Sequence, residues 1–325
     1  MTKAKPFIKW VGGKTQLIEQ LETMLPAELD NWDNVTYIEP FIGGGAMLFH
    51  MLQKYKNIHR AVINDINEDL TTCYLMVKNS PEELISSLHD IETAYLALHT
   101  DAARKEFYLA VRDRYNDKNL SAIENATKFF FLNRTCFNGL YRVNKKGLFN
   151  VPFGKYKNPT ICDAETILQD SELLKNVSIL NGDFEDTFDY AHGNTLFYFD
   201  PPYRPLSNTS SFNDYSKEPF NDFAQIRLKN FCDKINTAGF KFMLSNSDSK
   251  CTDEDESFFD SLYSEYQIER VWASRSINAN PEKRGKLTEI LVRNYAKCKR
   301  FNYETRGSQP MYVAESTPAY TKDTH

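Results

Sequence analysis

The sequence predicts an α/β protein in which parallel strands alternate with helices, and a mainly helical insertion carries a β-hairpin. Three observations lead to this prediction. Two β-prone runs flank a helical stretch before residue 66, and strand and helix signals resume after residue 176. Between them the chain carries helix-capping sequences instead of strands. Its 325 residues suffice for one large or two modest domains.

The N-terminal unit consists of a strand, a glycine-rich turn, a helix and a second strand. Residues 36–41 are β-prone, residues 43–45 are all glycine, residues 46–53 favour a helix, and residues 61–65 form a second β-prone run that ends in Asp65. Strands that are joined through a helix in this way run parallel, with a right-handed crossover.

The insertion follows this unit and is mostly helical. Residues 80–83 (Ser-Pro-Glu-Glu) and 121–124 (Ser-Ala-Ile-Glu) read as capping boxes, so each predicts the start of a helix. Residues 140–143 and 148–151 then predict a β-hairpin around a turn at residues 144–147.

The segment that contains this hairpin, residues 133–157, is basic although the chain as a whole is acidic. With 39 Lys and Arg against 44 Asp and Glu, the bulk charge gives no support to nucleic-acid binding. A solvated charged hairpin is one interpretation of the segment. The absence of acids and the aromatic residues between the cations favour a nucleic-acid surface instead. The cations of this segment are Arg134, Arg142, Lys145, Lys146, Lys155 and Lys157.

Strand and helix signals continue to residue 245. Residues 177–180, 195–199 and 240–245 predict strands, and residues 221–237 predict a helix that ends at Gly239. The acidic run at residues 253–256 is expected in a loop or at a helix start. We expect four regions, namely residues 1–66 and 159–296 for the sheet domain, 67–158 for the insertion, and 297–325 for a tail of uncertain order.

Composition excludes several classes of protein. No run of about 18 apolar residues is present for a membrane span, and the N-terminus opens no apolar signal region. The six cysteines form no C-x-x-C pair and the six histidines show no ligand spacing, which argues against a zinc site. We therefore expect a cytoplasmic protein with reduced thiols and no metal.

The glycine-rich turn and Asp65 indicate a nucleoside site. Glycines after a strand let a ligand approach the backbone, and an acid about 20 residues further on can accept both hydroxyls of a ribose. A purely structural turn is the alternative. The turn lacks the G-x-G-x-x-G spacing, so a dinucleotide is disfavoured. Residues 12–15 imitate the end of a P-loop, but Ile8 stands where its first glycine is required, so we reject a nucleoside triphosphatase.

The sharpest chemical feature is Asp200-Pro201-Pro202-Tyr203, which follows the strand predicted at residues 195–199. Two consecutive prolines remove the amide donors, so a carboxylate and carbonyl oxygens remain as acceptors. Such acceptors can hold both hydrogens of an exocyclic amino group while its ring stacks on the tyrosine. A structural turn could use the prolines, but it would not need an acid at the carboxyl end of a strand, where α/β sheets bind ligands.

Five dispersed motifs resemble those of Dam-type adenine methyltransferases of bacteria and their phages (D12 class, α group). The Dpn-type enzymes that modify GATC are particularly similar. The resemblance covers roughly residues 5–296 in matching order. It implies a Rossmann-like sheet with helices on both faces, and makes residues 67–158 a domain that recognises the DNA target. The motifs are Lys9-Trp10-Val-Gly-Gly-Lys14, Glu39-Pro-Phe-Ile-Gly-Gly-Gly45, Asn138-Gly-Leu-Tyr-Arg142, Phe149-Asn-Val-Pro-Phe-Gly154 and Asp200-Pro-Pro-Tyr203.

The resemblance implies S-adenosylmethionine as methyl donor, with S-adenosylhomocysteine as the product and no metal. A cationic sulfonium and amino group, an anionic carboxylate and a ribose diol then need partners. The expected contacts are the ribose at Asp65, the carboxylate at Lys14, an aromatic wall at Trp10, the methionine moiety at Phe41, Gly43 and Asp200, and the adenine at Asp183 and Phe184.

The acceptor that the resemblance implies is N6 of an adenine in double-stranded DNA. The N6 lone pair is delocalised into the ring, and acceptance of one hydrogen each by Asp200 and the Pro201 carbonyl favours a pyramidal nitrogen that points at the methyl group. Because a duplex hides N6, the base must be flipped out and held against Tyr203.

The resemblance also implies a set of DNA contacts. Phe137 stands where the family has Tyr and Lys155 where it has Arg, and these departures concern phosphate contacts rather than the reaction. The expected contacts are phosphates at Lys145 and Lys146, a guanine edge at Arg142, a wedge or thymine-methyl contact at Phe137 and Leu140, the orphaned partner base at Asn138, and further contacts at Lys9, Arg134, Lys155 and Tyr156.

Other acceptors remain open at this point, because cytosine N4, an RNA adenine and a protein glutamine all present a planar amino group. A non-catalytic DNA-binding relative is a further alternative, but a binder has no need of the intact acceptor motif at residues 200–203. The expected partner is double-stranded DNA in the nucleoid of a bacterial or phage-infected cell. A restriction endonuclease that acts on the same site is a candidate second partner.

Overall fold

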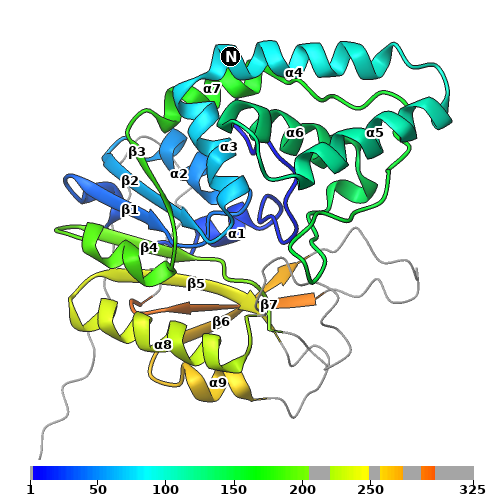
Figure 1. The fold of residues 1–325 in the computed structure, drawn as a ribbon. Helices are drawn as coiled ribbons and strands as arrows, with labels where there is room; N and C mark the ends of the chain where they lie inside the picture. The colour runs from blue at the N-terminus through cyan, green and yellow to red at the C-terminus, as the bar shows by residue number, and fades with distance from the viewer. Residues whose placement is uncertain (1–2, 205–219, 249–256, 274–286, 297–325) are drawn as a thin grey trace, which may run out of the picture.

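A mixed sheet forms the centre of the protein. The computed structural model describes residues 3–204, 220–248, 257–273 and 287–296 (Figure 1). Within these residues the strands are β1 (Val35–Glu39), β2 (Ile58–Asp65), β3 (Val177–Asn181), β4 (Thr195–Phe199), β5 (Lys241–Ser247), β6 (Gln267–Ala273) and β7 (Leu287–Arg293). Their order is β3-β2-β1-β4-β5-β7-β6. The first five in this order run parallel, whereas β7 lies antiparallel between β5 and β6.

Helices cover both faces of this sheet, as Figure 1 shows. Successive strand residues point to opposite faces, so Tyr37 and Ile63 belong to one apolar cluster and Ile38 and Val62 to the other. All five residues of β1 are buried because both of its faces are covered. The first cluster includes α1 (Ile18–Glu22), α2 (Ala46–Lys54) and α7 (Ala164–Leu174), and the second includes α8 (Asp222–Thr237) and α9 (Phe258–Leu262).

The predicted helical insertion is present between β2 and β3. It consists of α3 (Glu68–Asn79), α4 (Pro81–Leu96), α5 (Asp101–Asn116) and α6 (Ala122–Thr135), and α6 contacts the other three helices. In Figure 1 these helices gather above the strands, on the opposite side of the molecule from α8 and α9. Short 3-10 helices lie at Leu29–Asn31, Phe137–Gly139 and Phe184–Tyr190.

One of the two predicted capping boxes is confirmed and the other is wrong. The Ser121 side chain accepts a hydrogen bond from the Glu124 amide, and the Glu124 side chain accepts one from the Ser121 amide. Ser80 stands at the start of α4, but its side chain makes no capping bond. The reason is that Ser80 also ends α3, where its amide donates to the Met76 carbonyl, so the preceding helix sets its conformation.

The predicted hairpin is reduced to a single antiparallel bridge between Val143 and Phe149. Two backbone hydrogen bonds flank this bridge, from the Asn144 amide to the Leu148 carbonyl at 2.9 Å and from the Asn150 amide to the Arg142 carbonyl at 3.0 Å. The Phe149 amide donates to the Asn116 side chain, which returns a bond to the Phe149 carbonyl. The Asn144 side chain accepts from the amides of Lys146 and Leu148 and so closes the turn. The segment is therefore a ribbon-like loop held by asparagines.

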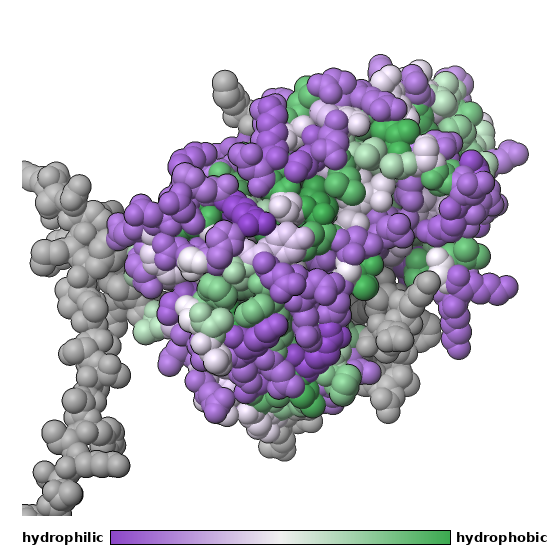
Figure 2. Space-filling model, turned by 60° about the vertical axis from the view of Figure 1, so that its left-hand side comes forward, coloured by the Kyte–Doolittle hydropathy of each residue, from purple (hydrophilic) through white to green (hydrophobic). Residues whose placement is uncertain are grey.

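The strands β6 and β7 and the helices α7 and α9 were not predicted. The acidic run at residues 253–256 and the tail at 297–325 lie outside the described residues. The face in Figure 2 is covered mostly by hydrophilic residues, with apolar residues in scattered groups. In the part of the chain that the structure describes, no helix combines the length and the apolar character that crossing a bilayer requires.

Candidate active site at the carboxyl edge of the sheet

The predicted chemical groups meet at one edge of the sheet. The chain passes from β1 through α2 to β2 on one side, while β4 pairs with β1 on the other, so the strand order reverses between β1 and β4. Open α/β sheets bind ligands at such a point, beyond the carboxyl ends of the strands. The glycine turn follows β1, Asp65 ends β2, and Asp200 follows β4.

The glycine turn has no room for larger residues. Gly43 has φ of +48°, and a Cβ atom there would lie 2.8 Å from the indole of Trp10. Gly45 has φ of +73°, and its Cβ would lie 2.5 Å from the Tyr74 hydroxyl. Both the left-handed conformation and the contacts therefore require glycine. Trp10, predicted as an aromatic wall, lies directly against this turn.

Asp65 is fixed by the backbone around it. One carboxylate oxygen accepts from the Gly43 amide at 3.2 Å and the other from the Asn67 amide at 3.0 Å. Burial raises the pKa of Asp65 to about 6, against the opposing effect of these amides. Each carboxylate oxygen can accept a second hydrogen bond, so the fixed carboxylate can still receive a hydroxyl pair.

Lys14 lies at the centre of a buried ionic cluster. Its ammonium is 2.8 Å from Asp200 Oδ1 and 3.1 Å from Glu289 Oε2, and it donates to the Tyr203 hydroxyl at 2.7 Å. The Tyr203 hydroxyl donates in turn to Glu289 Oε1 at 2.7 Å, and Ser245 donates to Glu289 Oε2 at 3.0 Å. Lys14, predicted from the resemblance as a partner for the cofactor carboxylate, is held here by the acceptor motif itself.

The cluster has a definite charge state at neutral pH. Burial raises the pKa of Asp200 to about 6, Lys14 opposes that rise and Glu289 adds to it. Burial disfavours the charge on Lys14, but Asp200, Tyr203 and Glu289 outweigh it and raise the pKa of the ammonium. Burial raises the pKa of nearby Glu39 to about 8, although the Tyr37 hydroxyl bonds to that carboxyl group. The pKa of Asp200 is therefore below that of Glu39, and Asp200 is the more ionised of the two carboxyl groups at neutral pH.

The prolines give the acceptor turn a fixed shape. Pro201 is buried and Pro202 is exposed. The side chain of Gln225, from α8, donates to the Pro202 carbonyl at 3.4 Å and accepts from Asn246 of β5 at 3.1 Å. The turn is thus tied to the sheet and to α8. Asp200 Oδ2 accepts no hydrogen bond from the residues that the structure describes, so it remains free to act as an acceptor.

Three more predicted residues lie at this edge of the sheet: Asp183 and Phe184, which follow β3, and Phe41, which follows β1. Asp183 follows β3, accepts from the Glu185 amide at 2.9 Å and pairs with Arg227 of α8. The Arg227 guanidinium lies over the Phe184 ring, 4.4 Å from its centroid. The rings of Phe41 and Phe184 are 5.3 Å apart. The three predicted residues are therefore neighbours, beside the glycine turn.

Some of the predicted DNA-contacting residues line a pocket around Lys9, and the others lie on the loop around Arg142 or are exposed near it. Lys9 lies over the ring of Tyr156 at 5.1 Å, and both line a pocket of about 350 Å³ with Arg134 and Lys157. Arg142 donates through Nε and Nη2 to the side chain and the carbonyl of Asn150, at 2.8 and 3.3 Å. Phe137, Asn138, Lys145, Lys146 and Lys155 are exposed, and Leu140 is half-buried.

Trp10 joins these groups to the sheet edge. Its ring stacks on Tyr141 at 5.5 Å and on Phe129 at 6.3 Å, and it also lies against the glycine turn. Tyr141 immediately precedes Arg142 in the basic segment. The basic segment and the glycine turn therefore share one aromatic side chain as a common support.

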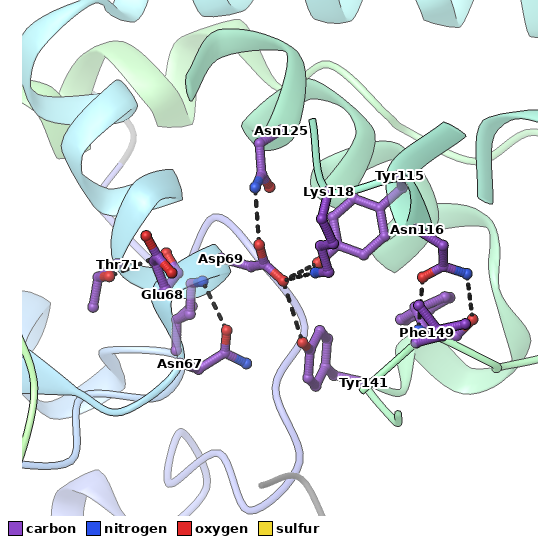
Figure 3. A network of polar contacts seen from close by, with 12 residues as sticks. Asn67, Glu68, Asp69, Thr71, Tyr115, Asn116, Lys118, Asn125, Tyr141 and Phe149 are labelled. Carbon is purple, nitrogen blue, oxygen red and sulfur yellow. Dashed lines mark hydrogen bonds and ion pairs between the residues drawn. The ribbon is translucent and has the colours of Figure 1, made fainter. Parts of the chain in front are cut away.

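A second support is Asp69, which sequence analysis missed (Figure 3). Its Oδ2 accepts from Tyr115 at 2.5 Å, from Lys118 at 2.8 Å and from Tyr141 at 3.5 Å, and its Oδ1 accepts from Asn125 at 2.8 Å. One carboxylate in the first turn of α3 thus holds the end of α5, the start of α6 and the basic segment. Burial opposes its ionisation, but these bonds outweigh burial and lower the pKa of Asp69.

Glu289 and Asp69 had no usable signal in the sequence. Glu289 belongs to an antiparallel strand that was not predicted, and Asp69 reads as one of two ordinary acids in the first turn of a helix. A charge of this kind stands out only when its partners are known. Among the described residues, no three His, Cys, Asp or Glu side chains form a group suited to a metal ion.

Comparisons with known proteins agree on one family. The family model for D12 class N6 adenine-specific DNA methyltransferase matches residues 10–277. The "Type II methyltransferase M.MjaIII" of Methanocaldococcus jannaschii is 49% identical over 296 residues, which cover 90% of this chain and 100% of that protein. The "Type II methyltransferase M1.LlaDCHI" of Lactococcus lactis subsp. cremoris is 40% identical, covering 90% and 95%. The "DNA adenine methylase" of Escherichia coli (strain K12) is 30% identical, covering 90% and 96%.

Proposed function

The chain belongs to the D12 class of N6 adenine-specific DNA methyltransferases, and from this premise we propose that it transfers the methyl group of S-adenosylmethionine to adenine N6 within GATC in duplex DNA, after flipping the base. Family membership selects adenine in DNA over the cytosine, RNA and protein acceptors considered above. The main support is the cluster of Asp200, Tyr203 and Lys14 at the carboxyl edge of the sheet, where the glycine turn follows the neighbouring strand β1.

The residues at the sheet edge fit S-adenosylmethionine by the chemistry of their donors and acceptors. Asp65 offers a fixed carboxylate to the ribose hydroxyls. Trp10 packs into the space that a side chain at residue 43 would fill, so it forms an aromatic wall against Gly43. Asp200 and Glu289 give the cluster one more negative charge than Lys14 neutralises, which suits a ligand with a net positive charge. When bound, the cofactor supplies an electrophilic methyl group on a sulfonium.

Asp200 then serves as the acceptor for the adenine amino group. Its Oδ1 is held by Lys14, so Oδ2 takes one N6 hydrogen and the Pro201 carbonyl takes the other. The nitrogen would become pyramidal, with its lone pair free to accept the methyl group. S-adenosylhomocysteine is the leaving group, and one N6 proton is released after the transfer. Positioning and electrostatic stabilisation of the growing positive charge on N6 provide the catalysis. Tyr203 is held through its hydroxyl, and the Lys14 ammonium lies over its ring at 4.8 Å from the centroid, so the base would stack on the opposite face.

The basic segment provides the binding energy that base flipping consumes, which is a few kcal/mol. Its exposed lysines contact phosphates and fix the position of the duplex, whereas Arg142 reads a guanine edge. Asn150 already holds the Arg142 guanidinium in one orientation. Two of the relatives are named type II methyltransferases, and we propose on that basis that a restriction endonuclease acting on the same site is a partner.

Incubation of the purified chain with S-adenosylmethionine and unmethylated plasmid DNA tests this function. We expect N6-methyladenine in the nucleoside digest, and sequencing that detects modified bases should place it at GATC. N4-methylcytosine instead of N6-methyladenine would contradict the proposed acceptor. Methyladenine in another sequence would contradict the proposed site.

Replacement of Arg142 by alanine should flatten the discrimination between GATC and sites that differ by one base pair. A bidentate guanine contact contributes roughly 1–3 kcal/mol of discrimination, so kcat/KM ratios between these sites should shrink by about 10- to 100-fold. The control is Arg142→Lys, which keeps the charge but loses the planar fork. An equal loss of affinity for every sequence would identify Arg142 as a phosphate ligand instead.

Replacement of Lys145 and Lys146 together by alanine should weaken the salt dependence of DNA binding. Each phosphate contact contributes about 0.9 to the slope of log K against log salt, so the slope should fall by about two. Both lysines are exposed at the turn of the basic segment. Lys175→Ala, which removes an exposed lysine that follows α7 and pairs with Glu172, should leave the slope unchanged. The same slope in the double variant would place the DNA elsewhere.

A further inference from the structure

We propose that Glu289 is a positioning residue for methyl transfer, which holds Lys14 and Tyr203 so that Asp200 keeps one carboxylate oxygen for the adenine amino group. This inference rests on the proposed function, because that function gives Asp200 its acceptor role. It adds to the acceptor motif a side chain from β7, which lies beyond the residues 10–277 matched by the family model.

The hydrogen-bond pattern supports this role. An ammonium group has three hydrogens, and the contacts of Lys14 are with Asp200, Tyr203 and Glu289. The contact with Glu289 draws the Lys14 ammonium away from Asp200. Without it, one more ammonium hydrogen is free to turn to Asp200, where it competes with the adenine amino group for Oδ2.

Glu289 also fixes Tyr203. The Tyr203 hydroxyl accepts from Lys14 and donates to Glu289 Oε1, so its bonds are directed on both sides. Among the described residues, Glu289 is the side chain that bonds to both Lys14 and Tyr203. Loss of this carboxylate would release the tyrosine ring from the orientation in which it can stack on a flipped base.

Glu289 is itself well anchored. Its side chain is buried, with 9% of the residue exposed, and it lies opposite Ser247 in the antiparallel pairing of β5 and β7. Ser245, also from β5, donates to its Oε2. A side chain anchored to a central sheet can orient others more precisely than one on a loop.

The charges around Asp200 give this role a signature in the pH profile. The groups that face Asp200 are Lys14 from the N-terminal segment, Glu39 from β1, Tyr198 from β4, Tyr203 from its own turn and Glu289 from β7. Glu289 raises the pKa of Asp200 and Lys14 lowers it. Removal of the Glu289 charge takes away a group that raises this pKa. It also leaves Asp200 as the carboxylate that pairs with Lys14, and each of these effects lowers the pKa of Asp200. Since Asp200 must be ionised to act, the acid limb of activity moves to lower pH.

The test compares Glu289→Gln with the unsubstituted chain, using S-adenosylmethionine and a GATC duplex. Misplacement of a reacting group by about 1 Å costs about 10²-fold, and we expect kcat to fall by that factor while the Kd for DNA is retained. The acid limb of kcat/KM should move down by about one pH unit. Glu265→Gln, which removes an exposed acid paired with Lys229, is the control and should change neither quantity.

A second variant separates positioning from charge. Ser245→Ala keeps the Glu289 carboxylate but removes the bond that anchors it, so kcat should fall while the acid limb stays in place. In Glu289→Gln, either of two results would overturn the inference: wild-type kcat, or a fall in kcat with an unmoved acid limb, which marks a merely structural role. Wild-type kcat in Ser245→Ala would also contradict it. Absence of DNA methylation by the unsubstituted chain would overturn the proposed function together with the inference.

Discussion

Replacement of Asp200 by asparagine is expected to lower kcat by about 10²- to 10³-fold, the range for loss of one preorganised group that stabilises developing charge. An asparagine can turn its carbonyl oxygen towards Lys14, but its NH2 group then faces the adenine amino group, donor against donor. The N6 lone pair stays delocalised in the ring. The variant should remain folded because Glu289 still neutralises the buried Lys14 ammonium.

Single-turnover rates with a GATC duplex measure this effect free of product release, and calorimetric titration with S-adenosylmethionine checks that the cofactor still binds. The matched control is Asp189→Asn, which removes an exposed carboxylate from the segment before β4 and should turn over normally. A rate within a few-fold of wild type for Asp200→Asn would end the proposed mechanism.

Replacement of Asp69 by alanine is expected to destabilise the protein by about 1–3 kcal/mol, as found when buried polar groups lose their hydrogen-bond partner. The buried Tyr115 hydroxyl and the Asn125 amide lose their acceptor, and Lys118 loses its counter-charge. Denaturant unfolding of both proteins, followed by circular dichroism, measures the difference. Glu68→Ala, which removes the neighbouring exposed acid of the same helical turn, should cost far less.

The same substitution should change the response to acid. Because the pKa of Asp69 is lowered in the folded state, its stabilising contribution is complete above the unfolded value of about 4. It is lost as the pH falls through the lowered folded value. The stability gap between wild type and Asp69→Ala should therefore narrow below pH 4. A gap that is constant with pH would show that packing, and not the charged hydrogen bonds, accounts for the difference.

Local sequence patterns predicted the part of the site that depends on local structure. The strands β1, β2 and β4, the glycine turn and the position of Asp65 follow from periodicity and from what glycine alone can adopt. The motif at residues 200–203 is recognisable because two prolines after a strand remove its donors. The parallel pairing then brings these groups to one edge of the sheet.

The parts that escaped prediction depend on partners that are distant in the chain. Whether Glu289 is an exposed or a buried acid depends on β7 entering the sheet antiparallel beside β5. The hairpin at residues 140–151 is limited to one bridge with a backbone hydrogen bond on either side, and Asn116, from α5, binds the Phe149 amide and carbonyl. Ser80 makes no cap because it already ends another helix. For Glu289 and Phe149 the partners lie far away in the chain, whereas for Ser80 the preceding helix overrides the capping preference.

The shared anchorage of the basic segment has a consequence for engineering. Tyr141 is bound by Asp69 and stacks on Trp10, which itself supports the glycine turn. A chimera that takes residues 133–157 from a relative with another target sequence must keep a tyrosine at this position. Without it, the exchanged segment loses its contacts with Asp69 and Trp10. Between Asn144 and Gly147, by contrast, the turn is closed by its own asparagine. The exposed positions of this turn can therefore be varied without changing the packing of the rest of the protein.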